Sequence, residues 1–135
     1  MEVTLGKSVK KGVEKYLQEL LSKYPISKER AIEKCNNLRN ALLALGEKPY
    51  ANPVCVHKDL GQRLDKNGDP IDKYLRRFNY QDESGFQWAF AYRVIKKKNK
   101  VSVIKMMPAS LVKEDKSGTL QGILNLMERV MNIRR

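Results

Sequence analysis

Cysteine and histidine are scarce in this chain, with two cysteines and one histidine among 135 residues. A disulfide-stapled domain of this length normally carries more cysteines, so we expect both thiols to be reduced. The only histidine, His57, stands next but one to Cys55, and no second ligand pair completes a zinc site. We therefore expect no metal site and no cofactor.

Long apolar runs are also missing. The longest comparable stretch, Ala41 to Leu45, has five residues, whereas a membrane-spanning helix needs roughly 18 or more. The first six residues lack the basic region and the long apolar stretch of a secretory signal. These features predict a cytoplasmic protein with no membrane partner.

Acidic residues are in the minority. Asp and Glu total 15 against 27 Lys and Arg, which gives a formal net charge of +12. Such an excess favours an acidic partner, nucleic acid above all. Hydrophobic residues make up 41% of the chain, enough for a core, and the length predicts a single domain over residues 1–135.

Several catalytic motifs are absent. The chain has no glycine-rich phosphate loop, no Gly-x-Ser-x-Gly elbow and no dinucleotide fingerprint. Adjacent carboxylates such as Asp82 and Glu83 fall in a turn signal, and we interpret them as solvated turn residues without an apolar pocket. An enzyme with this composition would have to work with Lys, Arg and Tyr side chains.

Two amphipathic helices are expected before residue 47, and together they form an antiparallel hairpin. Pro25 ends the first helix. Ser27 then offers an N-cap for the second, which has Glu29 in its first turn and runs to about Leu45. The apolar stripe of the first helix comprises Val9, Val13, Leu17, Leu20, Leu21 and Tyr24. That of the second comprises Ala31, Cys35, Leu38, Leu42 and Leu45.

Residues 47–72 form a proline- and glycine-rich insertion. The sequence does not decide whether it contains a short strand or a helical turn. From Lys73 the pattern has period two until a turn at 82–85, and further strands are expected over 86–95 and 101–107. The middle strand is apolar on both sides, as a central strand covered on both faces would be. These three strands predict an antiparallel meander.

The remaining segments complete an α+β fold. Residues 120–131 have the spacing of a C-terminal amphipathic helix, and residues 1–5 can add a short edge strand to the sheet. The expected order is therefore a short N-terminal strand, a helical hairpin, a three-stranded antiparallel meander and a C-terminal helix.

Charge is distributed unevenly along the chain. No acidic residue lies between Glu83 and Glu114, so one edge of the sheet should be strongly positive. We expect this edge to bind RNA backbone, although a solvated lysine turn that blocks edge pairing is an open alternative. The candidate RNA-binding residues are Lys73, Lys96, Lys97, Lys98, Lys100 and Lys105.

The candidate catalytic residues are Arg76, Arg77, Tyr92 and Arg93. Arginines inside strands, among aromatic residues, must be oriented by a partner, and a phenol beside them can act as an acid, a base or a stacking surface. Tyr80 is a second such phenol, and the other aromatic residues of the strands are expected to be mainly core. Alternation along a strand allows only one of the two adjacent arginines to share a face with the others.

The order of elements and one segment carry a resemblance. Residues 85–95, with Tyr92-Arg93-Val94, a Lys/Asn turn and the Val/Ile-rich residues 101–105, resemble the corresponding strands of the RelE/ParE toxin superfamily. The resemblance implies a small basic toxin encoded with an acidic antitoxin. Many such toxins cleave ribosome-bound messenger RNA without metal, whereas others act on DNA gyrase.

The resemblance also implies roles for particular residues. Lys73, Arg76 and Arg77 would hold the phosphate backbone and Arg93 would be the central-strand arginine, so that a ribose 2′-hydroxyl attacks its neighbouring phosphate at one convergent site. The family usually has His, Arg or Tyr near the end of the last strand, whereas this chain has residues 106–110, Met-Met-Pro-Ala-Ser. A second alignment puts Gln87 at the arginine position. The alternative is a non-catalytic nucleic-acid- or protein-binding module, of phage or plasmid type, that shares the topology.

Overall fold

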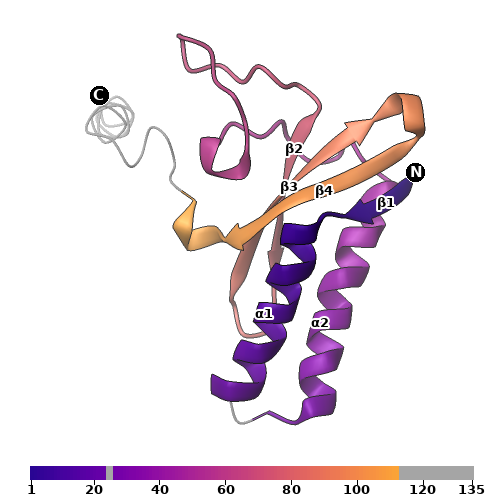
Figure 1. Ribbon diagram of the computed structural model, residues 1–135, viewed down its shortest axis with the longest axis vertical. Helices are drawn as coiled ribbons and strands as arrows, with labels where there is room; N and C mark the ends of the chain where they lie inside the picture. Colours follow the sequence, from indigo (N-terminus) through magenta and orange to yellow (C-terminus); the bar gives the residue numbers. More distant parts are fainter. Residues whose placement is uncertain (24–25, 113–135) are drawn as a thin grey trace, which may run out of the picture.

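The computed structural model describes residues 1–23 and 26–112, and it shows an α+β arrangement with two helices on one face of a four-stranded mixed sheet (Figure 1). In chain order the elements are β1 (Glu2–Leu5), α1 (Lys7–Lys23), α2 (Lys28–Leu43), β2 (Leu75–Gln81), β3 (Gln87–Ile95) and β4 (Lys100–Pro108). Short 3-10 turns are η1 (Ala44–Gly46), η2 (Lys58–Leu60), η3 (Lys96–Lys98) and η4 (Ala109–Leu111). This confirms the predicted fold class, while the expected C-terminal helix lies outside the described residues.

The sheet has the strand order β1-β4-β3-β2. The meander β2-β3-β4 is antiparallel as predicted, and β1 joins the edge of the sheet in parallel with β4. An irregularity between Ala91 and Tyr92 shifts the register of β3 against β4 by one residue, as a β-bulge does. The strand β3 is central, and both of its faces are buried along most of its length.

The helical hairpin covers one face of the sheet (Figure 1). Ser27 caps α2 as expected, because its hydroxyl oxygen accepts a hydrogen bond from the Arg30 amide at 3.1 Å, and the whole α2 stripe is buried. The stripe predicted for α1 is wrong at Leu21, which is 40% exposed, whereas Tyr16 is buried. Each residue of an α-helix is rotated by about 100° around the helix axis from the one before it. Tyr16 therefore lies within about 20° of the buried Val9, whereas Leu21 lies about 120° from Val9 and outside the buried face.

Part of the insertion covers an area of the opposite face. Cys55 and Leu60 from this segment pack against Leu75, Ala89 and Ala91 in a second core cluster. Of the two structures left open for the insertion, the helical turn occurs as η2, whereas residue 54 forms only an isolated bridge with residue 76 and no strand. No helix in the described part of the chain is long and apolar enough to cross a membrane.

Candidate nucleic-acid surface

The two faces of the sheet separate the four candidate catalytic residues. Arg76 pairs with Tyr92 across β2 and β3, on the face that packs against the helices. Arg77 pairs with Ala91 and Arg93 pairs with Leu75, on the opposite face, where Ala91 and Leu75 belong to the second cluster. The structure therefore does not bring the four side chains to one phosphate, because adjacent residues in a strand point to opposite faces.

Tyr92 is part of the core. Its side chain is fully buried, its hydroxyl donates a hydrogen bond to the Pro49 carbonyl at 2.7 Å, and it accepts one from the Asn52 amide at 3.2 Å. Burial raises the pKa of the phenol, although the bonds to Asn52 and the charge of Arg76 oppose that rise. In this position Tyr92 fastens the start of the insertion to β3.

Arg76 fastens the same segment from β2. Its guanidinium donates hydrogen bonds to the carbonyls of Tyr50, at 3.3 Å, and of Asn52. It also lies 5.0 Å from the centroid of the Tyr50 ring, within the range of a cation–π contact. Arg76 and Tyr92 thus hold the loop on either side of Tyr50.

Arg93 is neutralised by an internal partner. Its Nη2 and Nε atoms lie 2.8 Å and 2.9 Å from Oδ2 of Asp72. Burial opposes ionisation of Asp72, but the Arg93 guanidinium and the amide of Tyr74 outweigh it and lower the pKa of that carboxyl. This ion pair anchors the end of the insertion to β3.

Arg77 and Lys105 lie in one row across the sheet. Ala91, between them on β3, pairs with Arg77 on β2 and with Lys105 on β4. Neighbouring strands lie about 4.8 Å apart, so the backbone positions of Arg77 on β2 and Lys105 on β4 are about 10 Å from each other. The Arg77 Nε donates a hydrogen bond to the Asn79 side-chain oxygen at 3.0 Å, and Lys105 is exposed.

A hollow of about 480 Å³ adjoins this row at the end of the sheet near the β2–β3 turn. It brings together a guanidinium, an amide, a hydroxyl and an exposed aromatic ring. Its lining residues are Arg77, Gly85, Phe86, Gln87, Ala109 and Ser110. Cationic and neutral polar groups beside an aromatic ring are suited to a phosphate and an unpaired base.

Apart from Lys105, the predicted lysines gather at the other end of the sheet. Lys96, Lys97 and Lys98 form η3, which ends at Asn99 in the left-handed conformation (φ 48°) before Lys100 begins β4. The Lys96 ammonium lies 5.7 Å from the ring centroids of both Tyr50 and Tyr74.

Lys73 is exposed beside Tyr74. Sequence reasoning missed the two tyrosines, although both occur close to the ends of the insertion and next to basic segments.

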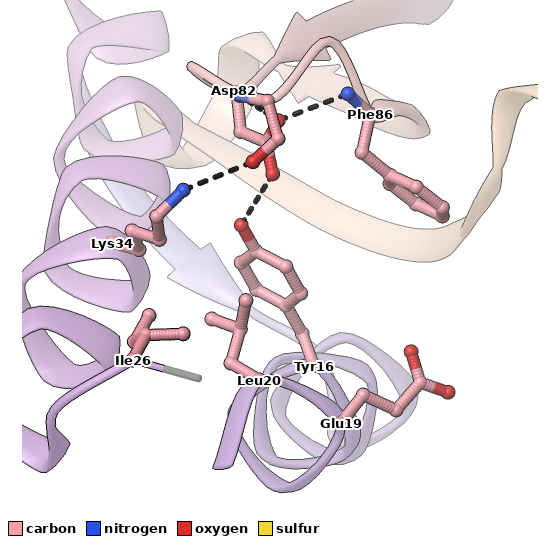
Figure 2. A pocket seen from close by; sticks show the side chains of 8 residues that line it. Tyr16, Glu19, Leu20, Ile26, Lys34, Asp82 and Phe86 are labelled. Atoms are coloured by element: carbon pink, nitrogen blue, oxygen red, sulfur yellow. Dashed lines mark hydrogen bonds between the residues drawn. The ribbon is translucent and has the colours of Figure 1, made fainter. Parts of the chain in front are cut away.

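Sequence reasoning also missed a contact between Tyr16 and Asp82. Figure 2 shows the Tyr16 hydroxyl donating to Oδ2 of Asp82, at 2.8 Å, beside a pocket of about 110 Å³ under the β2–β3 turn. Burial, followed by the hydrogen bond to Asp82, raises the pKa of Tyr16. The interpretation of Asp82 as a purely solvated turn residue is therefore wrong, since α1 supplies both the hydroxyl and apolar pocket walls.

No group of three His, Cys, Asp or Glu side chains able to hold a metal ion occurs among residues 1–23 and 26–112. Neither a protein-family model nor a curated protein sequence matches the chain.

Proposed function

We propose that the protein binds single-stranded RNA on the sheet face turned away from the helices, and that it acts on messenger RNA at the ribosome as RelE-like toxins do. The observation that carries the proposal is the row of Arg77, Ala91 and Lys105 beside the polar hollow. Ala91 is buried in the second core cluster, so phosphates would contact the two cationic side chains and not the residue between them. The element order from β1 to β4 supports the same proposal, because it is the order that the family resemblance implies.

Lysines at the far end of the sheet extend the basic surface. The η3 lysines and Lys100 follow the C-terminal end of β3, where Arg93 is already paired with Asp72. A strand of RNA bound along this face would meet Lys105 and Arg77 in the middle and the η3 lysines at one end. Its phosphates would displace condensed counterions at each contact. A cytoplasmic target and an acidic antitoxin that covers the basic surface complete the proposal.

Metal-independent cleavage of the bound RNA is a second candidate function. The observation that favours it is Arg77, which lines the hollow together with the Ser110 side chain. A guanidinium fixed beside a phosphate stabilises the negative charge that develops when a 2′-hydroxyl attacks. Tyr92 is buried on the other face, so it does not supply the proton transfer that such cleavage requires. Binding is accordingly the function that the geometry supports best.

Salt-dependent binding tests the main proposal. Fluorescence anisotropy with a labelled single-stranded RNA should give an affinity that falls steeply with salt, and the Arg77→Ala/Lys105→Ala double variant should reduce the slope by about 1.4 units, or about 0.7 per phosphate contact. The matched control is Lys10→Ala/Lys11→Ala, which removes two exposed charges from α1. Absence of RNA binding by the parent, or an equal loss in the control, would contradict the proposal.

Cleavage is tested separately on programmed ribosomes in single-turnover reactions. If Arg77 stabilises the transition state, Arg77→Ala should slow cleavage by about 100-fold or more, while Arg76→Ala should act only through the stability of the insertion. A parent protein that binds RNA but leaves messenger RNA intact would restrict the function to binding.

A further inference from the structure

We infer that Tyr50, Tyr74 and Lys96 form a stacking platform for an unpaired base of the bound RNA strand, an inference that rests on the proposed RNA binding. This tyrosine platform stands at the β3–β4 end of the sheet, where η3 meets both ends of the insertion. Arg76 and Tyr92, which hold the loop at Tyr50, lie on the helix-packed face, so the RNA strand would pass round this end of the sheet to reach the rings. It adds a contact to the bases, whereas the lysines contact only the backbone.

Exposure distinguishes these two rings from most of the aromatic residues. Tyr50 is 43% and Tyr74 is 48% exposed, whereas Tyr16, Trp88, Phe90 and Tyr92 are buried. A large aromatic ring left in water contributes little to folding, since its apolar area is not removed from solvent. Two such rings beside one ammonium group are therefore better explained by contact with a ligand than by packing in the core.

The charge around the rings favours a nucleic acid. Among the described residues no carboxylate forms an ion pair with Lys96, whose ammonium lies over the two rings. The ammonium sits on a flexible stem, so it can move from the rings to a phosphate when a base takes its place. Lys73, Lys97 and Lys98, all exposed, lie beside these residues in the chain and supply further phosphate contacts.

The backbone that carries each ring is held in place. The loop at Tyr50 is fixed by the Arg76 guanidinium, through the carbonyls of Tyr50 and Asn52, and by the Tyr92 hydroxyl, through the Pro49 carbonyl. The Tyr74 amide donates to Asp72 at 3.0 Å, and the Tyr74 carbonyl accepts from the Val94 amide at 3.2 Å.

Two of the expected catalytic residues, Arg76 and Tyr92, are thus positioning residues for the platform. Because the backbone at both rings is held in place, less ordering is needed when the rings stack on a base.

Substitution of both tyrosines tests the platform. Tyr50→Leu/Tyr74→Leu removes the rings, and Tyr50→Phe/Tyr74→Phe is the matched control that keeps stacking. Anisotropy with an oligouridylate or oligoadenylate of about 12 nucleotides should show binding about 5-fold to 100-fold weaker for the leucine variant and close to that of the parent for the phenylalanine variant. The salt slope should remain unchanged, because no charge has been removed.

A spectroscopic probe gives the direct measurement. An RNA that carries 2-aminopurine should lose fluorescence when it binds the parent or the phenylalanine variant, and the loss should be abolished in the leucine variant. Circular dichroism and thermal unfolding of each variant show that it is folded.

The outcomes separate the platform from RNA binding itself. Equal affinity and equal quenching in the leucine and parent proteins would overturn the platform while RNA binding stands. Failure of the parent to bind RNA would overturn both. If the leucine variant instead loses affinity for a proline-rich peptide that the parent binds, and keeps its RNA affinity, the rings serve a protein partner and the inference is wrong.

Discussion

The two hairpin turns of the meander use charge in opposite ways. In the β2–β3 turn, Asp82 accepts hydrogen bonds from the Tyr16 hydroxyl and from the amides of Ser84 and Phe86, while Glu83 pairs with Arg30 on α2. In the β3–β4 turn the three lysines of η3 have no carboxylate partner among the described residues. The first turn is tied to the helices, and the second presents its charge to solvent.

Under the proposed function, this difference separates a turn that stabilises the fold from a turn that would bind RNA. Charged groups that satisfy each other within the chain stabilise it, but their fields largely cancel. Cations without internal partners add little to stability and leave a field that attracts phosphate. The β2–β3 turn should therefore respond to substitution through stability, and the β3–β4 turn through RNA affinity.

The largest expected effect is at the β3–β4 turn. Replacing Lys96, Lys97 and Lys98 with Ala should reduce the salt slope of RNA binding by about two units, which amounts to an affinity about 100-fold weaker at 0.1 M salt than the parent's. Lys7→Ala/Lys10→Ala/Lys11→Ala, three exposed charges at the start of α1, is the control. A parental slope in the η3 variant would mean that these lysines form only a solvated turn.

At the β2–β3 turn, Asp82→Ala should lower the free energy of unfolding by about 2 kcal/mol. The variant loses acceptors for the Tyr16 hydroxyl and two backbone amides, each net contribution being about 0.5 to 1.5 kcal/mol. Urea unfolding measures the change, with Lys97→Ala as the matched control at the other turn, expected within about 0.5 kcal/mol of the parent. Similar losses at both turns would remove the distinction.

A smaller effect is expected for Tyr16→Phe, about 1 kcal/mol, because one hydrogen bond is lost while the ring stays in place. The pKa of Tyr16 is raised in the folded protein. The phenol therefore contributes fully to the free energy of unfolding below the ordinary tyrosine pKa of about 10, and this contribution declines as pH rises above that value. Unfolding measured from pH 8 to pH 11 should show this decline in the parent and less of it in the variant. Parallel curves would exclude Tyr16 as the titrating group.

The smallest effect is expected at the Asp72–Arg93 ion pair. Arg93 is partly exposed, so Asp72→Asn should cost about 0.5 to 1 kcal/mol at neutral pH. Because the folded-state pKa of Asp72 is lowered, its contribution is present above the ordinary aspartate value and is lost as pH falls through the lowered one. Stability curves of parent and variant should therefore converge in acid, and a constant difference down to pH 2 would contradict the assignment.

Most of the secondary structure could be predicted because it depends on local periodicity. The α2 stripe, the Ser27 cap and the doubly buried β3 all follow from side-chain spacing within one element. Alternation along the strand also predicts that Arg76 and Arg77 lie on opposite faces of the sheet. These features need no knowledge of distant contacts.

The site was harder to predict because its contacts join distant parts of the chain. Arg76 reaches carbonyls more than twenty residues away, and Tyr92 and Tyr16 find partners at separations of 43 and 66 residues. The insertion provides most of these partners, and its proline-rich sequence has no periodicity from which its path can be derived. The sequence therefore gives no indication of whether an arginine or tyrosine inside a strand binds a ligand or holds a loop of the same chain.

The place of β1 in the sheet has a consequence for synthesis of the chain. Within the part of the chain that the structure describes, β1 pairs with β4 alone, with Glu2 opposite Lys100 and Leu5 opposite Val103. On a ribosome that adds about 5 to 20 residues each second, the partner strand follows β1 by about 5 to 20 s. During that interval the hairpin of α1 and α2 has been made but lacks the strands that cover its apolar stripe. We expect this nascent hairpin to be a binding target for chaperones, and the parallel β1–β4 pairing to be a late event in folding.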